Sequence, residues 1–305
     1  MENFLGIDIG GSGFKYGWGN CKEGLHFFQT IYLKKKDIDE FLATAKQIFQ
    51  TVDNQVGLHT IKGIGIGIPG TLDKLTGCVV GNNPNLPFWV NHSPRELIPT
   101  DCKLPFAFDN DANLMALAEA SLQRKQNIIG VTIGSGIGCG IIIEGRIFQG
   151  ANGYAGELGH ICAVDKGIKC SCGKLGCLEA YSSVDGLRRC LALAHPRYAE
   201  MDLPALMAVK DTDTLVNEYI KRSQHLLSIA LANLATCLDP ETIIMGGGAM
   251  DFDLYCIKEM EKEIRATIPL AHSAKMTVNK ASEGNKAGVI GAIKLIEQKF
   301  YGGWE

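Results

Sequence analysis

Two segments about half a chain apart share one pattern, an apolar strand, a glycine-rich turn and a second apolar strand. In residues 3–19 the turn reads Gly10-Gly11-Ser12-Gly13, and in residues 127–143 it reads Gly134-Ser135-Gly136-Ile137-Gly138. Short strands joined by such turns form β-hairpins. A hairpin that recurs at this distance indicates a duplicated α/β lobe.

Helical and strand patterns alternate around these hairpins. Apolar residues at helical spacing predict helices over 37–52, 111–122, 212–238, 252–265 and 285–299. Short apolar runs predict strands over 61–68, 241–245 and 276–279. Strands that alternate with helices are typical of the α/β class, here with mixed sheets. The length of 305 residues is enough for two lobes.

Composition and charge exclude several classes of protein. The chain is 46% hydrophobic with a formal net charge of −3, which is ordinary for a globular protein and unlike the basic surface that nucleic acids require. It contains no uninterrupted apolar run of about 18 residues, as a transmembrane helix would need. Met1-Glu2-Asn3-Phe4 does not begin a signal peptide. We therefore expect a cytoplasmic protein without nucleic-acid or membrane partners.

One histidine and three of the eleven cysteines gather in a glycine-rich stretch. They are His160, Cys170, Cys172 and Cys177. In a reducing compartment this spacing favours a metal over disulfides, with a run of free thiols as the alternative. Three thiolates and one imidazole complete a tetrahedral zinc shell. Because no position stays open, we expect structural rather than catalytic Zn²⁺.

The glycine-rich turns suggest a phosphate ligand, since glycine lets backbone N–H groups approach one closely. Asp8 precedes the first turn and can hold a hydrated Mg²⁺ on nucleotide phosphates. A third turn, Gly246-Gly247-Gly248, suits a base or ribose, and a plain strand-to-helix turn explains it equally well. The segment Asp109-Asn110-Asp111 joins a strand to a helix, where a carboxylate can accept a proton from a hydroxyl or simply cap the helix.

In this order, these motifs resemble those of the ROK family of sugar kinases, within the actin/Hsp70/hexokinase superfamily. The matching motifs are Asp-x-Gly-Gly at 8–11, Ile68-Pro69-Gly70, Asn110-Asp111-x-Asn113, Gly-x-Gly-x-Gly at 134–138, Gly153, Gly156 and Gly159 with His160, and Cys-x-Cys-Gly-x-x-Gly-Cys-x-Glu at 170–179. The resemblance implies a two-lobed, actin-like ATPase (ribonuclease H-like) fold. A small lobe would contain residues 1–110 and 289–305, and a larger lobe residues 111–288 with a zinc knuckle at 156–179, separated by a cleft.

The resemblance also implies an activity, the ATP- and Mg²⁺-dependent phosphorylation of a hexose at O6, with Asp111 as the general base. Sugar contacts are implied at Gly70, Asn83, Asn110, Asp111, Glu157, His160 and Glu179. Contacts to ATP and Mg²⁺ are expected at Asp8, Gly10, Gly11, Ser12, Lys15, Thr132, Gly134, Ser135, Gly136, Gly247 and Gly248. One ring nitrogen of His160 would bind zinc while the other donates to the sugar.

Several alternatives stay open within this interpretation. Glucose is the first substrate expected, with N-acetylglucosamine or N-acetylmannosamine as the alternative. Gly11-Ser12-Gly13 with Lys15 resembles glucokinases that use polyphosphate, whereas the cysteine motif favours ATP. Sugar-responsive repressors share the fold but carry a winged helix ahead of the first hairpin, for which we expect no room here. A sugar sensor without kinase activity is disfavoured by Asp111. Because many relatives are dimers, we expect a homodimer.

Overall fold

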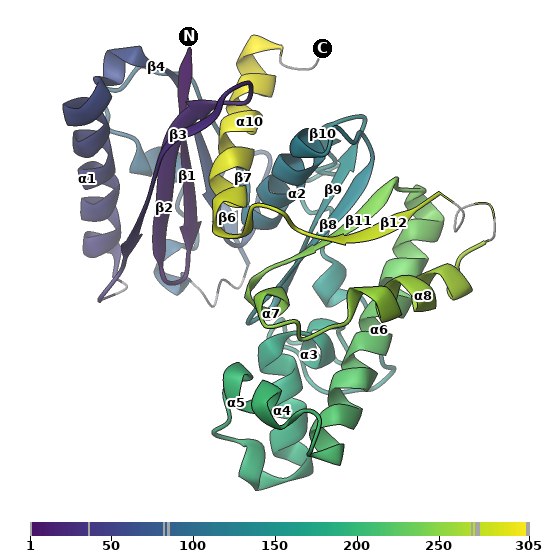
Figure 1. Ribbon diagram of the computed structural model, residues 1–305. Helices are drawn as coiled ribbons and strands as arrows, with labels where there is room; N and C mark the ends of the chain where they lie inside the picture. Colours follow the sequence, from purple (N-terminus) through teal and green to yellow (C-terminus); the bar gives the residue numbers. More distant parts are fainter. Residues whose placement is uncertain are drawn as a thin grey trace. The chain divides into compact units, whose positions relative to one another are not determined.

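The computed structural model describes residues 2–35, 37–81, 83, 86–269, 271 and 275–302 (Figure 1). Contacts divide the chain into two compact units. The first comprises Met1–Arg124, Gly145–Ala155 and Glu283–Glu305, and the second comprises Lys125–Glu144 and Gly156–Ser282. Residues 303–305 of the predicted small lobe lie outside the described residues. No helix within the described ranges has both the length and the apolar character needed to cross a bilayer.

The first unit is built on a mixed five-stranded sheet in the order β3-β2-β1-β4-β7. Its strands are β1 (Asn3–Gly10), β2 (Gly13–Asn20), β3 (Gly24–Tyr32), β4 (Ile61–Ile68) and β7 (Phe106–Asn110). The hairpin β1–β2 is antiparallel and closes at the pair Gly10 and Gly13, whereas β4 runs parallel to β1 and to β7. The short strands β5 (Thr71–Leu72), β6 (Val79–Val80) and β10 (Arg146–Ile147) also belong to this unit.

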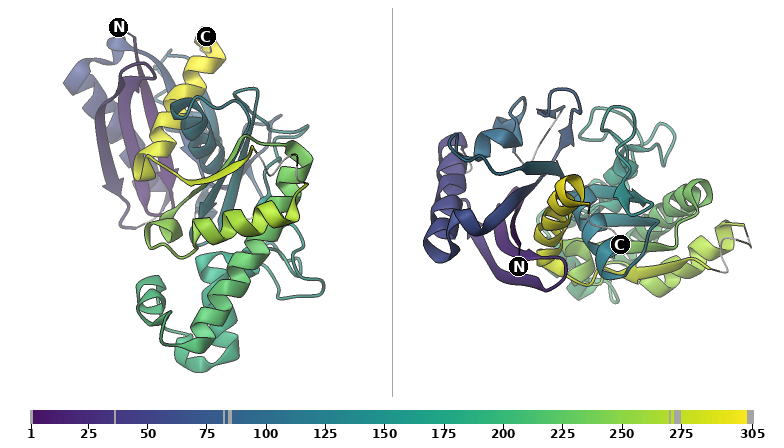
Figure 2. Two further views of the ribbon diagram at one scale, coloured as in Figure 1. Left: turned by 45° about the vertical axis from the view of Figure 1, so that its right-hand side comes forward. Right: turned by 90° about the horizontal axis from the view of Figure 1, so that it is seen from above.

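Three long helices cover this sheet: α1 (Ile38–Val56), α2 (Asp111–Leu122) and α10 (Ala287–Tyr301). α1 and α10 lie on opposite faces (Figure 2). β1 alternates between these faces: Leu5, Ile7 and Ile9 join the core beneath α1, and Gly6 meets α10. A Cβ atom at Gly6 would lie 2.4 Å from the carbonyl oxygen of Val289. Glycine in the strand therefore allows α10 to pack directly on the backbone of the sheet.

The position of α2 differs from the predicted lobe boundary at residue 110. α2 packs along α10 and contacts β1, β4 and β7, so it belongs to the first unit. The contact is close, because a Cβ atom at Gly291 of α10 would lie 1.9 Å from the carbonyl oxygen of Leu114 in α2. Asp111, at the start of α2, thus shares a unit with Asp8 and the first glycine turn.

The second unit repeats the strand arrangement of the first. Its strands are β8 (Ile128–Ile133), β9 (Ile137–Ile143), β11 (Thr242–Gly246) and β12 (Thr277–Lys280), in the order β9-β8-β11-β12. β8–β9 is an antiparallel hairpin, and β11 runs parallel to β8 and to β12. The first unit has the same order and directions in β2-β1-β4-β7. The predicted duplication of an α/β unit with mixed sheets is confirmed.

Within the residues that the structure describes, the second unit contains the helices α3 (Glu179–Ser182), α4 (Val184–Ala194), α5 (Leu203–Val209), α6 (Thr214–Leu238), α7 (Gly248–Asp251) and α8 (Ile257–Thr267). The prediction of one helix over 252–265 is wrong at its start. α7 ends at Asp251 and α8 begins at Ile257. Asp253 between them has a φ of 49°, a left-handed conformation that interrupts helical hydrogen bonding.

Candidate functional site

In the first unit, the side chains of Asp8, Lys15 and Asp111 lie close enough for their charges to affect one another. Asp8 is only 8% exposed, and its Oδ2 lies 3.5 Å from the Nζ of Lys15 on the paired strand. Asp111 is half-buried at the start of α2, where its Oδ1 accepts the N–H of Ala112 at 2.9 Å. The structure therefore brings together Asp8, Lys15 and Asp111, which were predicted separately.

Burial and, to a smaller extent, the negative charge of Asp8 raise the pKa of Asp111 to about 6, against the opposing effects of the Ala112 N–H hydrogen bond and of Lys15. Burial also raises the pKa of Asp8, while the charge of Lys15 and its hydrogen bond lower it. A carboxylate with a pKa near physiological pH is suited to accept a proton from a substrate hydroxyl. The charged and hydrogen-bonding groups named as causes of this shift, Asp8, Lys15 and the N–H of Ala112, all belong to the first unit.

Gly288, in the first turn of α10, is a site residue that sequence reasoning missed. A Cβ atom there would lie 2.4 Å from the Cγ of Asp8 and 2.5 Å from its Oδ2. On the strand side, a Cβ atom at Gly67 would lie 3.3 Å from Asp8 Oδ1. Asp8 is thus enclosed by two glycine backbones. The sequence carries no local signal for Gly288, because 280 positions separate it from Asp8.

Asp109 anchors the junction that carries Asp111. Its Oδ1 accepts the N–H of Asn110 and the Nδ2 of Asn113, both at 2.7 Å, and its Oδ2 accepts the Nε2 of Gln149 at 2.6 Å. Burial raises the pKa of Asp109, and these hydrogen bonds act in the opposite direction. Gln149 was also missed by the sequence analysis, since nothing in the sequence pairs it with a residue forty positions earlier. This network fixes the strand end from which α2 starts.

Of the four predicted sugar-binding residues in the first unit, Gly70, Asn83 and Asn110 lie together, and the two asparagines hold the backbone. Asn83 is buried, donates to the carbonyl of Pro69 at 2.8 Å and accepts the N–H of Leu86 at 3.1 Å. Asn110 donates to the carbonyl of Gly70 at 3.0 Å and accepts the N–H of Ala112 at 2.8 Å. The N-cap of α2 is therefore the amide of Asn110, whereas the simpler interpretation expected a carboxylate in this role. Their contacts to sugar stay predictions.

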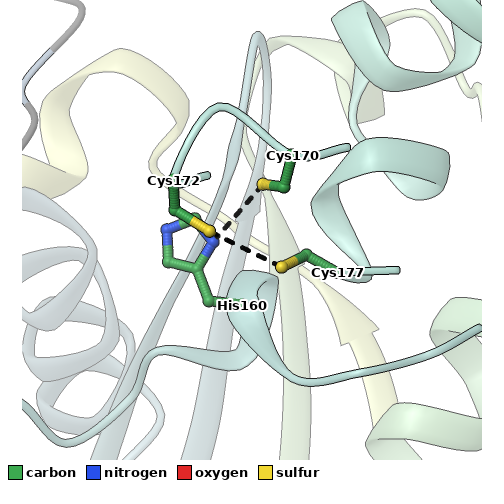
Figure 3. A group of neighbouring side chains, drawn as sticks. All are labelled: His160, Cys170, Cys172 and Cys177. Carbon is green, nitrogen blue, oxygen red and sulfur yellow. Dashed lines mark hydrogen bonds between the residues drawn. The ribbon is translucent and has the colours of Figure 1, made fainter. Parts of the chain in front are cut away.

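In the second unit, the predicted metal ligands converge (Figure 3). The ligand atoms of His160, Cys170, Cys172 and Cys177 all lie within 4.8 Å of one another. Cys172 Sγ is 3.6 Å from Cys177 Sγ, and Cys170 Sγ is 3.8 Å from His160 Nδ1. A tetrahedral zinc with bonds of about 2.3 Å to sulfur separates its ligands by about 3.8 Å. The arrangement therefore fits a tetrahedral metal ion.

The two ring nitrogens of His160 lie near different groups. Nδ1 lies toward Cys170, and Nε2 lies 3.9 Å from a carboxylate oxygen of Glu157. Both side chains are exposed. The binding of metal by one nitrogen and of sugar by the other stays a prediction.

The second glycine turn lies against Glu179. Glu179 Oε2 accepts the N–H of Ile137 at 2.9 Å, while its Oε1 accepts the hydroxyl of Ser171 at 3.2 Å. The third turn adjoins the end of β8, the strand that leads into the second turn. A Cβ atom at Gly247 would lie 2.4 Å from the carbonyl oxygen of Ile133, the last residue of β8. The structure brings together these predicted nucleotide residues of the second unit: Thr132, Gly134, Ser135, Gly136, Gly247 and Gly248. Gly10, Gly11 and Ser12 form the first turn in the other unit.

Comparison with known proteins now decides the family. The family model for the ROK family matches residues 4–299. The chain belongs to the ROK family. The family predicted from the sequence motifs is thereby confirmed.

Two curated relatives match nearly the whole chain. A glucokinase of Halalkalibacterium halodurans is 31% identical over an alignment of 320 positions, which covers 97% of this chain and 95% of that protein. An N-acetyl-D-glucosamine kinase of Photobacterium profundum is 31% identical over 309 residues, 96% of this chain and 98% of that protein. Both names are those of sugar kinases, the enzyme class predicted from the sequence.

The crystal structure of a ROK family glucokinase from Streptomyces griseus, in complex with glucose and AMPPNP, has a TM-score of 0.76 with this chain. It is 25% identical, and the match covers 97% of this chain and 99% of that one. The α/β fold with mixed sheets therefore matches that of a ROK sugar kinase.

Proposed function

We propose that this ROK family member transfers the γ-phosphoryl group of ATP to the O6 hydroxyl of a hexose, with Asp111 as the general base. One observation carries the proposal: the environment of Asp111 holds a carboxylate at a strand–helix junction with a pKa of about 6. Such a group is ionised at neutral pH yet basic enough to accept the hydroxyl proton as the phosphoryl group arrives. Asp109 and its three hydrogen bonds keep that carboxylate in place.

Phosphoryl transfer depends mainly on positioning and on charge stabilisation. We assign phosphate contacts to the glycine turns and to Ser12 and Lys15, whose ammonium group lies beside Asp8. Asp8 is the residue suited to hold Mg²⁺, which would neutralise phosphate charge when it is bound with the nucleotide. Lys15 and Asp8 then orient the nucleotide in the first unit, and no covalent step on the protein is needed.

For the sugar, we assign contacts to Gly70, Asn83, Asn110, Glu157, His160 and Glu179. His160 supports this assignment best, because its Nε2 lies away from the cysteines and toward Glu157. Zinc held by His160 and the three cysteines would supply structural order to this loop when it is bound. Glucose is the first substrate, and N-acetylglucosamine is the second candidate, since one of the relatives described above is named a glucokinase and another an N-acetyl-D-glucosamine kinase.

The test is an ADP-release assay with a panel of hexoses and N-acetylhexosamines, run with ATP and separately with polyphosphate as donor. The proposal expects ATP- and Mg²⁺-dependent turnover with one or more sugars and a 6-phosphate product, identified by phosphorus–proton NMR correlation. Asp111→Asn is the matched inactive control. Sugar binding without phosphorylation, detected by calorimetry, would contradict the proposal and favour a sugar sensor. The homodimer and the cytoplasmic location stay predictions of the sequence.

A further inference from the structure

The segment 145–155 belongs to the first unit, although the chain on either side of it belongs to the second unit. Two glutamine side chains fasten this segment to the first unit. Gln298 of α10 donates its Nε2 to the carbonyl of Gly145 at 2.8 Å. Gln149, within the segment, donates its Nε2 to Oδ2 of the buried Asp109 at 2.6 Å. Of these two contacts, the second is the one made to the strand end that leads to the proposed base.

Gln149 lies at the neck of a closed loop. Its carbonyl accepts the N–H of Ala155 at 3.2 Å, which brings the two ends of the loop 149–155 together. The loop packs tightly on β5, because a Cβ atom at Gly153 would lie 2.7 Å from the carbonyl oxygen of Leu72. Since the loop is closed at its neck and packed at its tip, it presents the side chain of Gln149 from a fixed backbone.

The carboxylate of Asp109 divides its two oxygens between different partners. Oδ1 accepts the N–H of Asn110 and the Nδ2 of Asn113, whereas Oδ2 accepts the Nε2 of Gln149. Asn113 is 5% exposed, and its Oδ1 has no hydrogen-bond partner among the described residues, so its side chain is oriented by the bond to Asp109. Asp111 lies in the chain between these two asparagines. Its orientation therefore depends on how the Asp109 carboxylate is held.

A buried carboxylate oxygen without a donor is costly. If Gln149 were removed, the Asp109 carboxylate would rotate toward another donor or bind a proton. Either response would weaken the hydrogen bonds of Oδ1 and release the start of α2. Small displacements of a catalytic group lower the rate of the chemical step far more than they alter the binding of substrates.

We propose that Gln149 is a positioning residue for the general base: through Asp109 it fastens the loop 149–155 to the strand end that carries Asp111. Phosphoryl transfer then depends on this one hydrogen bond, whereas the binding of sugar and nucleotide does not. The inference rests on the proposed kinase function, in which Asp111 accepts the hydroxyl proton.

Four variants test this role. Gln149→Met keeps the length of the side chain and removes its donor. Gln149→Glu places a second carboxylate against Asp109 with no donor between them. The double variant Asp109→Asn with Gln149→Glu exchanges the amide and the carboxylate: the new amide keeps an oxygen for the partners of Oδ1 and offers its nitrogen to the new carboxylate. Gln298→Met is the matched control, because it removes the other glutamine that fastens the same segment.

The measurement is kcat and KM for ATP and for the sugar that the wild type phosphorylates, with urea unfolding to verify that each variant is folded. We expect Gln149→Met to lower kcat about ten- to a hundredfold, the range for one hydrogen bond to a charged group, while both KM values change less than about threefold. Gln149→Glu should lower kcat further, and the exchange of amide and carboxylate should restore at least about tenfold of that loss. Gln298→Met should keep kcat near that of the wild type, even where it lowers stability.

The possible failures are distinguishable. If the wild type phosphorylates no sugar, the proposed function fails, and this inference fails with it. If the wild type is active and folded Gln149→Met keeps its kcat, only the positioning role is overturned. A raised sugar KM at unchanged kcat would overturn it in favour of a substrate contact. Equal losses of kcat in Gln149→Met and Gln298→Met would also overturn it, because fastening of the segment, and not the bond to Asp109, would then matter. Gln149→Met adds no charge and decides the question if Gln149→Glu does not fold.

Discussion

Replacing the proposed base, Asp111→Asn, should abolish most turnover and at the same time stabilise the first unit. Without a proton acceptor, kcat should fall by at least about 10²-fold, the range for a positioned acid–base group. Asparagine keeps the shape of the side chain and an oxygen for the N–H of Ala112, so sugar binding should survive. The variant should gain stability because the folded protein holds Asp111 at a raised pKa, and this gain should depend on pH.

The folded state binds a proton at Asp111 more tightly than the unfolded chain does, with a pKa of about 6 against an ordinary value of 3.8. Stability therefore falls as the pH rises from about 4 to about 6, because the unfolded chain releases this proton first. Above about pH 6 the full penalty applies, and the shift corresponds to up to about 3 kcal/mol. In Asp111→Asn the side chain cannot ionise, so the variant does not lose this stability above pH 6.

The assay is urea unfolding of both proteins between pH 4 and pH 8, followed by tryptophan fluorescence. Trp18 and Trp89 are buried in the first unit, so their emission reports its unfolding. We expect the variant to be more stable at pH 7 to 8, with the difference vanishing toward pH 4. Asp101→Asn, an exposed carboxylate in the same unit, is the control. In the wild type, kcat should fall as the pH drops through about 6.

Two results would refute this reasoning. Near-normal turnover of correctly folded Asp111→Asn would remove the assignment of the base. A variant that lost turnover but showed no pH-dependent gain in stability would mean that Asp111 is not held as an unfavourable buried charge. For a carboxylate that serves catalysis at a cost in stability, we expect the substitution to lower activity and raise stability together.

Three further predictions concern neighbouring residues. Asp8→Asn removes a charge that raises the pKa of Asp111, so the acid limb of the kcat–pH profile should move to lower pH. Gly288→Ala places a methyl group 2.4 Å from the Cγ of Asp8 and should weaken Mg²⁺-dependent turnover at least about tenfold, with sugar affinity intact by calorimetry. Elemental analysis should find one zinc per wild-type chain and none in Cys172→Ala, whose sugar KM should rise while AMPPNP binding persists. Zinc-free, active wild-type enzyme would refute the site.

Local sequence determined much of the fold. Glycine turns between apolar runs define both hairpins, since their φ/ψ freedom and hydrophobic pattern act within a few residues. α2 begins at Asp111, as predicted, because Asn110 caps it through a contact two residues away. The cysteine motif is similarly local, and its four ligand atoms converge as expected. The helix predicted at 252–265 failed where Asp253 adopts a left-handed conformation that periodicity does not reveal.

Tertiary structure alone decided what surrounds these residues. Gly288 against Asp8, Gln149 on Asp109 and Glu179 on Ile137 join positions 40 to 280 residues apart. No local pattern encodes such contacts, because they arise only when separate strands and helices pack. The same packing set the pKa of Asp111, since burial and the nearby charge of Asp8 both depend on how α2 and β1 meet. Sequence determined which chemical groups the chain carries, and close packing decided their proton affinities and partners, because desolvation and Coulomb energies depend on distance through space.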